Sequence, residues 1–537
     1  MACRASRRLL VLAWLALVSP ALAQLSSTPQ SSTDNDARYA VTGSVVDSVT
    51  GEPVRRALVQ IFAQQQRSTL TDGDGHFEFD GLPEMQTTVN VRKPGYFSEP
   101  EINSTPPMVT IGPNSQSVVL KLVPEAIVFG TIQSTIGEPL EHIPVKLIAV
   151  RMLDGRKHWE TLNATTTNVD GVFRFANLQP GSYYVEAGPS WEERLPNRRH
   201  MQNGMDGYPA TYHPAAEQVA SASPIELAPG QHAQVDFSLK SAPMFRVSGH
   251  IAGVSSGQSV NLQFSDPNGE ALPFPVDFDP GKGTFQAWVL PGAYELQAGS
   301  QGADGQAMVG SLPLPVHADM TGLRINLALA VSVPLVTRFE FANSQFVQAA
   351  RREAPGAGVH LIAAESSIAG NDHWPDAAQN GELAFHNLRP GQYSLAFSST
   401  GPWYIRAAEC GGVDLLREKL TISAGVPTPP IEIVLRDDGS ILSGTVMFDG
   451  HPSQGKVVAV PDRAPALAVQ SSAGPDGHFQ FNNLPPGDYS VLAFDNTDRL
   501  EYTNPDVLGS FLASASRLTL QPVQESEAAV NLIRGAY

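Results

Sequence analysis

Apolar and polar residues alternate with a period of two along most of the chain. The pattern is clearest in Phe77–Phe79, Phe173–Phe175 and Phe479–Phe481, where two aromatic residues flank one polar residue. In a β-strand the two aromatic side chains share one face and the polar side chain points to the other. No amphipathic helical stretch separates the strand-like segments, which argues against a parallel α/β fold. The pattern therefore predicts an all-β protein.

One motif recurs through the sequence: a glycine, Phe-x-Phe, a leucine, and Pro-Gly-x-Tyr followed by an alternating apolar run. Its five copies are Asp72–Val91, Asn168–Ala187, Gly281–Ala298, Asn380–Ala396 and Pro475–Ala493. The leading glycines are spaced by 96, 112, 98 and 96 residues. A period held through five copies indicates internal duplication. The first copy lacks Pro-Gly-x-Tyr, and the third lacks the Asp-Gly or Asn-Gly pair before the first phenylalanine.

Each repeat also begins with a similar strand. These opening strands are Val41–Asp47, Val128–Gln133, Val247–Gly253, Val336–Ala342 and Leu442–Phe448, and only the fourth has no glycine. The Asp-Gly and Asn-Gly pairs supply the positive φ that a tight hairpin turn needs. About seven short strands in roughly 96 residues predict a two-sheet sandwich of immunoglobulin size. Two facing sheets bury alternate side chains, so no disulfide is required.

The repeat fixes the expected domain boundaries. We expect a signal peptide at 1–23, a disordered linker at 24–38, and sandwiches at 39–124, 125–243 with an insert at 188–223, 244–332, 333–438 and 439–537.

The first 23 residues have the pattern of a secretory signal peptide. Three arginines precede the apolar run Leu9–Val18, and Ala21–Ala23 forms an A-x-A cleavage site. The apolar run is shorter than the ~20 residues of a spanning helix. We therefore expect export without a membrane span after cleavage. Free secretion, periplasmic residence and association with the cell surface stay open.

Composition narrows the possible partners. The formal net charge is -18, so phosphate backbones would repel the chain and nucleic-acid binding is not expected. Cys3 leaves with the signal peptide, so Cys410 is alone in the mature chain and no intrachain disulfide can form. Cys410 is either a reactive or cross-linking thiol or a small apolar residue in a strand or turn.

The segment Gly43–Phe62, followed by Thr71–Leu82, resembles the carboxypeptidase regulatory-like domain, a transthyretin-like and carbohydrate-binding-like β-sandwich. The second repeat resembles it more closely. Gly207–Gln231 and Trp403–Gly425 look like segments of secreted bacterial multi-repeat members. The resemblance, which extends over nearly all of the mature chain, implies five tandem immunoglobulin-like or transthyretin-like antiparallel β-sandwiches. It also implies non-catalytic accessory modules.

The sequence contains few candidates for catalysis or metal binding. The sequence has no His-x-x-Glu pair for a zinc peptidase, and Gly253–Gly257 fits G-x-S-x-G but lies between two strands rather than before a helix. We expect no enzyme activity, no catalytic residues and no cofactor. Asp72 and Asp74 are weak calcium candidates, because calcium needs six to eight oxygens and turn chemistry accounts for both residues.

The longest irregular stretch, residues 188–223, supplies most of the candidate ligand-binding residues. The candidates are aromatic or imidazole side chains that could stack on sugar rings: Trp191, Tyr208, Tyr212, His213 and, in the fourth repeat, Trp374. The alternative is packing in a core or loop, since aromatic residues are usually buried. Long loops in compact domains tend to be functional or disordered.

Three functions follow from these observations. The first is an exported binding or adhesion-type protein whose partner is a glycan or a protein outside the cytoplasm. The second is a purely structural spacer. The third is an enzyme with an unrecognised site in the 188–223 insert.

Overall fold

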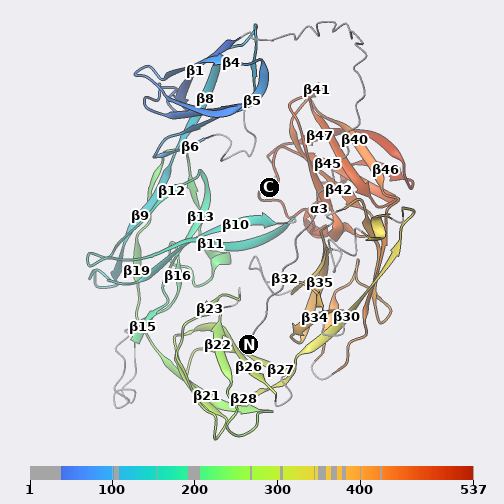
Figure 1. Cartoon of the computed structure of the whole chain (residues 1–537). Helices are drawn as coiled ribbons and strands as arrows, with labels where there is room; N and C mark the ends of the chain where they lie inside the picture. Colours follow the sequence, from blue (N-terminus) through green and yellow to red (C-terminus); the bar gives the residue numbers. More distant parts are fainter. Residues whose placement is uncertain are drawn as a thin grey trace, which may run out of the picture. The chain divides into compact units, whose positions relative to one another are not determined.

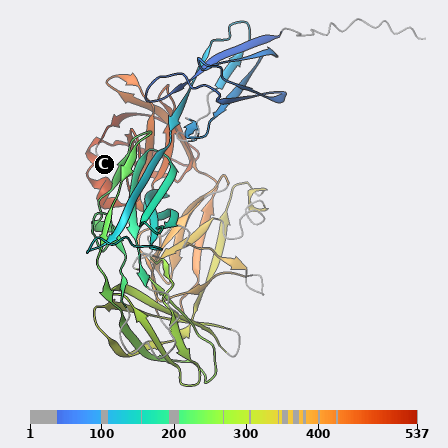
Figure 2. The ribbon, with the colours of Figure 1, turned by 90° about the vertical axis from the view of Figure 1, so that its left-hand side faces the viewer.

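The computed structural model describes residues 38–98, 101, 108–153, 155–191, 206–266, 269–302, 306–343, 345–348, 358–363, 372–377, 382–398, 401–423 and 426–535 (Figure 1). The predicted signal peptide, the linker before Arg38 and residues 192–205 of the insert lie outside these residues. The described chain is built of strands with a few short helices (Figures 1 and 2). The predicted all-β class of tandem β-sandwiches is confirmed. No helix in the described part of the chain is long and apolar enough to cross a membrane.

The chain divides into two compact units, Met1–Pro94 with Ser98–Leu122, and Gly95–Phe97 with Val123–Tyr537. The first sandwich has two sheets. One contains, in spatial order, β4 (His76–Leu82), β1 (Tyr39–Asp47), β8 (Val118–Pro124) and β6 (Tyr96–Ser98), and the other β3 (Gln65–Leu70), β2 (Leu58–Ala63), β5 (Met85–Arg92) and β7 (Met108–Ile111).

The second sandwich likewise pairs two sheets. One contains β11 (Arg156–Thr166), β10 (Pro144–Leu153), β13 (Gly181–Ala187) and β16 (Thr211–Tyr212), with β17 (Ile225–Leu227) also on β13. The other contains β12 (Val172–Leu178), β9 (Ala126–Ser134), β18 (His232–Gln234) and β19 (Phe237–Leu239). The 3-10 helix η1 (Val219–Ser221) lies in the insert.

The third sandwich follows the same plan. One sheet contains β24 (Val276–Asp279), β25 (Thr284–Val289), β21 (Phe245–Ala252) and β28 (Met320–Asn326). The other contains β23 (Ala271–Leu272), β22 (Asn261–Ser265), β26 (Gly292–Gln301), β27 (Ala307–Val316) and β29 (Ala328–Leu329). A small sheet of β14 (Ser190–Trp191), β15 (Asp206–Tyr208) and β20 (Ala242–Pro243) lies at its junction with the second sandwich.

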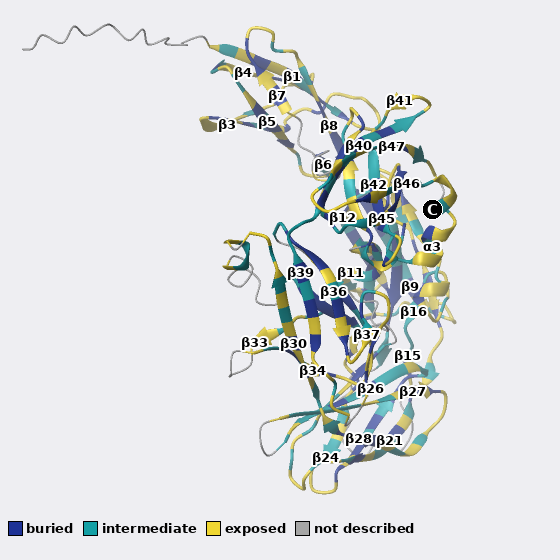
Figure 3. Ribbon diagram, turned by 90° about the vertical axis from the view of Figure 1, so that its right-hand side faces the viewer, coloured by how far each residue is buried: buried dark blue, intermediate teal, exposed yellow. Residues whose placement is uncertain are grey.

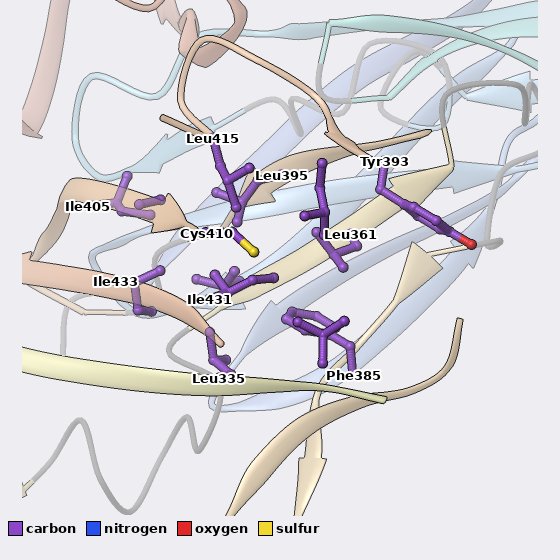
Figure 4. Close-up of a cluster of buried hydrophobic side chains, with 14 of the residues drawn as sticks. Leu335, Leu361, Phe385, Tyr393, Leu395, Ile405, Cys410, Leu415, Ile431 and Ile433 are labelled. Atoms are coloured by element: carbon purple, nitrogen blue, oxygen red, sulfur yellow. The ribbon is translucent and has the colours of Figure 1, made fainter. Parts of the chain in front are cut away.

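The fourth sandwich encloses a large apolar core. One sheet contains β33 (Asp376–Ala377), β34 (Leu383–Leu388), β30 (Val331–Glu340), β39 (Ile431–Arg436), β36 (Tyr404–Cys410) and β37 (Val413–Asp414). The other contains β32 (Asp372–His373), β31 (Val359–Ala363), β35 (Gly391–Phe397) and β38 (Leu420–Ile422). Figure 3 shows buried and exposed residues alternating along β36 and β39. Cys410 is buried in this core beside Ile431 and Leu415, and burial raises the pKa of its thiol (Figure 4).

In the fifth sandwich the two sheets are joined. β47 (Glu525–Ile533) pairs with both β40 (Ser440–Phe448) and β45 (Gly487–Phe494). The remaining strands are β41 (His451–Pro452), β42 (Gly455–Pro461), β43 (Val469–Ala473), β44 (His478–Leu484) and β46 (Ser516–Leu520). The short helices are η2 (Pro465–Leu467), α3 (Pro505–Gly509) and η3 (Leu512–Ser514). Residues around α3 form a second apolar cluster, which includes Leu492, Leu500 and Leu508.

The first and last strands of every sandwich pair in parallel. The pairs are β1 with β8, β9 with β18 and β19, β21 with β28, β30 with β39, and β40 with β47. Most other pairs are antiparallel, as the sequence analysis expected, and the parallel pair is an addition to that expectation. Because parallel strands run in the same direction, the chain enters each sandwich at one end and leaves at the other.

The tyrosine of the repeated motif has a structural role in the second to fifth sandwiches. The hydroxyl groups of Tyr183, Tyr393 and Tyr489 donate hydrogen bonds of 2.7–2.9 Å to the carbonyl oxygen four residues earlier. Tyr294 makes a longer bond of 3.3 Å to Pro291. A buried phenol needs such a partner, so the tyrosine fixes the turn before its strand.

Candidate functional site

A strand of the 188–223 insert pairs with the linker between the second and third sandwiches. In the small sheet, Trp191 of β14 pairs with Gly207 of β15, and Gly207 also pairs with Ala242 of β20. β20 directly precedes the third sandwich. The insert therefore holds the linker through backbone hydrogen bonds. The part of the insert at 192–205, which the enzyme hypothesis also included, lies outside the described residues.

Trp191 contacts the third sandwich, although it belongs to the insert of the second. Its ring stacks on Phe274 with a centroid distance of 4.7 Å and an interplanar angle of 22°. It also packs against the core cluster that contains Phe264 and Leu290. An added Cβ at Gly207 would lie 2.9 Å from Leu290, so the backbone of β15 is also close to this core. Trp191 therefore occupies an apolar interface between the two sandwiches.

The other three candidates of the insert lie on the second sandwich. Tyr208 is partly buried against its core. Tyr212 is buried opposite Glu186 and hydrogen-bonds to the carboxylate. His213 packs edge-on against Phe237 at 5.9 Å, and burial lowers its pKa. Its Nδ1 is buried without a hydrogen-bond partner. A ligand-binding role of these residues stays a prediction.

A buried charge cluster joins the same two sandwiches. Lys146 of β10 lies opposite Glu186 of β13, and Nζ is 3.5 Å from Glu186 Oε1 and 2.7 Å from Glu270 Oε1 of the third sandwich. Glu186 is only 3% exposed. Burial raises the pKa of Glu186 to about 7; Lys146 lowers it, whereas Glu270 and Asp266 raise it further. Burial lowers the pKa of Lys146, but the two glutamates raise it above its ordinary value.

The sequence analysis did not single out this cluster. Its one available signal was the polar Glu186 within the apolar run of β13, because a charged residue that interrupts such a run needs a partner. The partner Glu270 belongs to another repeat, and alternation within a strand carries no information about contacts between repeats.

Trp374 differs from the other candidates because it is exposed. It connects β32 to β33, its side chain is 54% exposed, and its ring stacks on the buried His360 at 4.4 Å and 21°. Polar groups lie on the adjoining strands: His386 Nε2 is 3.1 Å from Asp376 Oδ1, and Asp372 Oδ2 is 3.9 Å from His360 Nε2. One face of the indole is covered and fixed, while much of the side chain remains open to solvent.

Asp72 caps the turn before β4. Its Oδ1 accepts hydrogen bonds from the backbone N–H groups of Asp74 (3.0 Å) and His76 (2.8 Å). Asn168 makes the same pair of bonds in the second repeat. Within the described residues, no group of three or more His, Cys, Asp or Glu side chains is placed to hold a metal ion. Calcium binding by Asp72 and Asp74 stays a prediction.

Comparison with known families supports the resemblance for the first sandwich. Residues 40–117 match the family described as carboxypeptidase regulatory-like domain. No curated protein matches the chain.

Solved structures give weak matches. The streptococcal ancillary pilin has 11% sequence identity, with 54% of this chain and 99% of that chain covered and a TM-score of 0.20. The shaft pilin SpaA from Lactobacillus rhamnosus GG has 11% identity, with 38% and 98% covered and a TM-score of 0.21. The Bacillus anthracis TIE protein has 9% identity, with 93% and 69% covered and a TM-score of 0.15.

Proposed function

We propose that this chain is an exported, non-catalytic tandem β-sandwich protein of the binding or adhesion type. The signal-like segment at 1–23 supports export. The regulatory-like match at 40–117 supports a module without catalytic residues of its own. Every sandwich has its own apolar core, and its chain enters and leaves at opposite ends, as suits modules joined in series.

The proposed ligand is a carbohydrate, and the observation that carries this proposal is the exposed indole of Trp374. Stacking on His360 fixes the ring before any ligand arrives, so little side-chain entropy is lost on binding. Flat apolar faces suit sugar rings. The carboxylates of Asp372 and Asp376 and the imidazole of His386 offer hydrogen-bond partners for hydroxyl groups beside such a face.

A glycan array with the mature chain tests this proposal. We expect Trp374→Ala to weaken binding to the captured glycan at least tenfold, while Trp374→Phe keeps part of it. Phe62→Ala is the matched control, because Phe62 is an aromatic residue of the first sandwich that is 62% exposed. No captured glycan, or equal losses for Trp374→Ala and Phe62→Ala, would overturn the assignment.

A purely structural role is the second candidate, and the stacking of Trp191 on Phe274 favours it. A spacer needs fixed junctions, and this contact ties the second sandwich to the third. We expect Trp191→Ala to accelerate proteolysis between Leu239 and Phe245, because the linker strand β20 loses its support. Trp374→Ala should leave the cleavage rate unchanged. Equal rates for wild type and Trp191→Ala would contradict a fixed junction.

A further inference from the structure

The hairpin of β10 and β11 extends beyond the sheet of the second sandwich. β10 pairs with β13 only as far as Ala149, and the residues Val150–Leu153 pair with β11 alone. The two strands have 10 and 11 residues, whereas β2 and β3 of the first sandwich have 6 and 6, and β42 and β43 of the fifth have 7 and 5. A two-stranded ribbon alone is only marginally stable in water. The end of this hairpin therefore gains from a partner outside its own sheet.

The end of the hairpin contacts the fifth sandwich. The carbonyl oxygen of Gly155 accepts hydrogen bonds from Thr503 Oγ1 at 2.8 Å and from the N–H of Thr503 at 3.3 Å. The N–H of Lys157 donates a 3.3 Å hydrogen bond to Glu501 Oε1. Gly155 has a φ of 72°, and a Cβ added to it would lie 2.5 Å from the ring of Tyr502. The two surfaces therefore fit so closely that they leave no space for a side chain at Gly155.

A second contact joins the same two sandwiches on a different strand. Glu226 lies on β17, and Ser182 of β13 donates a 2.9 Å hydrogen bond to its Oε1. Arg499 Nη2 donates hydrogen bonds of 2.9 Å to both carboxylate oxygens of Glu226. Two contacts on separate strands fix the orientation of the fifth sandwich against the second as well as its position.

The segment of the fifth sandwich that receives the hairpin is ordered by its own sandwich. Leu500 is 0% exposed and belongs to the apolar cluster around α3. The N–H of Tyr502 donates a 2.8 Å hydrogen bond to the carbonyl oxygen of Leu500, and the N–H of Asn504 donates a 2.9 Å bond to that of Glu501. The Asn504 side chain accepts a bond from the N–H of Asp506 and caps α3. The receiving surface therefore does not need the second sandwich in order to form.

These contacts do not involve the apolar cores. Within the described part of the chain, no core cluster contains residues of both the second and the fifth sandwich. The hydrogen bonds of Lys157 and Arg499 are exposed, and exposed polar contacts are individually weak. They can therefore break while both sandwiches stay folded. The paired residues are 273 and 348 positions apart, so the contacts close the third and fourth sandwiches into a loop.

We propose that Gly155, Lys157 and Glu226 of the second sandwich and Arg499–Thr503 of the fifth form a reversible clasp. When the clasp is closed, the second and fifth sandwiches are held together and the third and fourth form a loop between them. When it is open, the four sandwiches are joined only in series and the chain is longer. The clasp does not include Trp374, so it is independent of the proposed carbohydrate site.

Chemical cross-linking tests the closed state. Glu226→Cys combined with Arg499→Cys places thiols at two positions whose side chains are 57% and 55% exposed, while Cys410 stays buried in the fourth core. Treated with a short bismaleimide at low protein concentration, the full mature chain should form an intramolecular cross-link that shifts its mobility on a denaturing gel. Neither single variant should show this shift. Absence of the cross-link in the double variant would overturn the proposal.

Variants at the end of the hairpin locate the clasp. In the double-cysteine chain, Gly155→Asn should lower the cross-linking rate about tenfold, because the rate follows the population of the closed state and the new side chain meets Tyr502. Gly137→Asn is the matched control: Gly137 lies in the same sandwich at a φ of 83°, and nothing lies within 4 Å of its added Cβ. Asparagine tolerates a positive φ in both places. Equal rates for the two variants would overturn the assignment.

Two further measurements do not depend on the folding of the hairpin variant or on cysteines. Thr503→Val removes a hydroxyl donor from the fifth sandwich and leaves the hairpin intact, and we expect it to lower the cross-linking rate about threefold. An unchanged rate would contradict the clasp. In small-angle scattering of the mature chain, Gly155→Asn should increase the radius of gyration and Gly137→Asn should not. Equal radii for the two variants would refute a longer open state.

Discussion

At the scale of single residues, the glycine found in four of the five opening strands is required by its neighbours. An added Cβ at Gly444 would overlap the carbonyl oxygen of Ala528 in the parallel strand β47 and approach the ring of Phe479 to 2.8 Å. Gly130 has the same conflict with Val235. In the fourth repeat, Leu335 takes this register position and faces Leu383 instead of a phenylalanine. The loss of the glycine and the loss of the ring therefore occur together.

We predict that Gly444→Ala destabilises the fifth sandwich by about 2–4 kcal/mol, because overpacking forces the parallel strand pair apart. Hydrogen exchange should rise in β40, β44 and β47 and stay unchanged in the other sandwiches. Gly509→Ala is the control, since nothing lies within 4 Å of its added Cβ. Similar exchange in the two variants would refute the steric argument.

At the scale of elements, the asparagine or glycine before the motif leucine makes a bulge. Asn177, Asn387 and Asn483 have φ values of 57–58°, and Gly81 has 67°. Each of these residues directly precedes the motif leucine, which pairs with the opening strand. In all four pairs of strands the register shifts between the Phe-x-Phe segment, or its Leu-x-Phe counterpart in the fourth repeat, and this leucine. The third repeat has one residue fewer between Phe285 and Gly292, and its strand pair shows no shift. The length of the motif thus decides whether the bulge forms.

We predict that Asn483→Val destabilises the fifth sandwich by about 1–2 kcal/mol, because β-branched residues avoid a positive φ. Asn483→Gly should stay within about 0.5 kcal/mol of wild type, since glycine adopts this conformation readily. Asn482→Val, one residue earlier in extended backbone, is the matched control. Thermal unfolding checks all three, and equal losses for the two valine variants would argue against a bulge-specific effect.

The sequence predicted the features that depend on the periodicity within one strand. It could not predict those that depend on which strands pair or which repeats are in contact. The Phe-x-Phe segments formed β4, β12 and β44 because alternate burial is encoded within each strand. The parallel pairing of first and last strands was missed, since a period of two does not specify the direction of the neighbour. The stacking of Trp191 on Phe274 was missed because its partner lies in another repeat.

At the scale of the whole molecule, contacts link repeats that are distant in sequence. Arg499 of the fifth sandwich donates two 2.9 Å hydrogen bonds to Glu226 of the second, and Thr503 Oγ1 donates a 2.8 Å bond to the carbonyl of Gly155. The exposed Arg499–Glu226 pair contributes little by itself, since exposed ion pairs are typically worth about 0–1 kcal/mol. The cluster of Lys146, Glu186 and Glu270 differs from this pair because Glu186 is buried, which makes the charge of its carboxyl group sensitive to pH.

The raised pKa of Glu186 predicts a junction that is more stable at acidic pH. The folded carboxyl group has a pKa of about 7, against an ordinary value of 4.5. Between these values the folded state holds a proton that the unfolded state has lost, so stability falls as pH rises through this window. Lys146 of β10, Tyr212 of β16, and Asp266 and Glu270 of the turn between β22 and β23 face the carboxyl group.

Glu186→Gln tests this prediction, because the amide resembles the protonated carboxyl group and does not titrate. Between pH 5 and 8, the midpoint of thermal unfolding of the wild type should fall more steeply than that of Glu186→Gln, and the two should differ least at pH 5. Glu226→Gln, on an exposed carboxylate, controls for general charge effects and should keep the wild-type slope. If Glu186→Gln retained the full pH dependence, the group responsible would lie elsewhere in the chain.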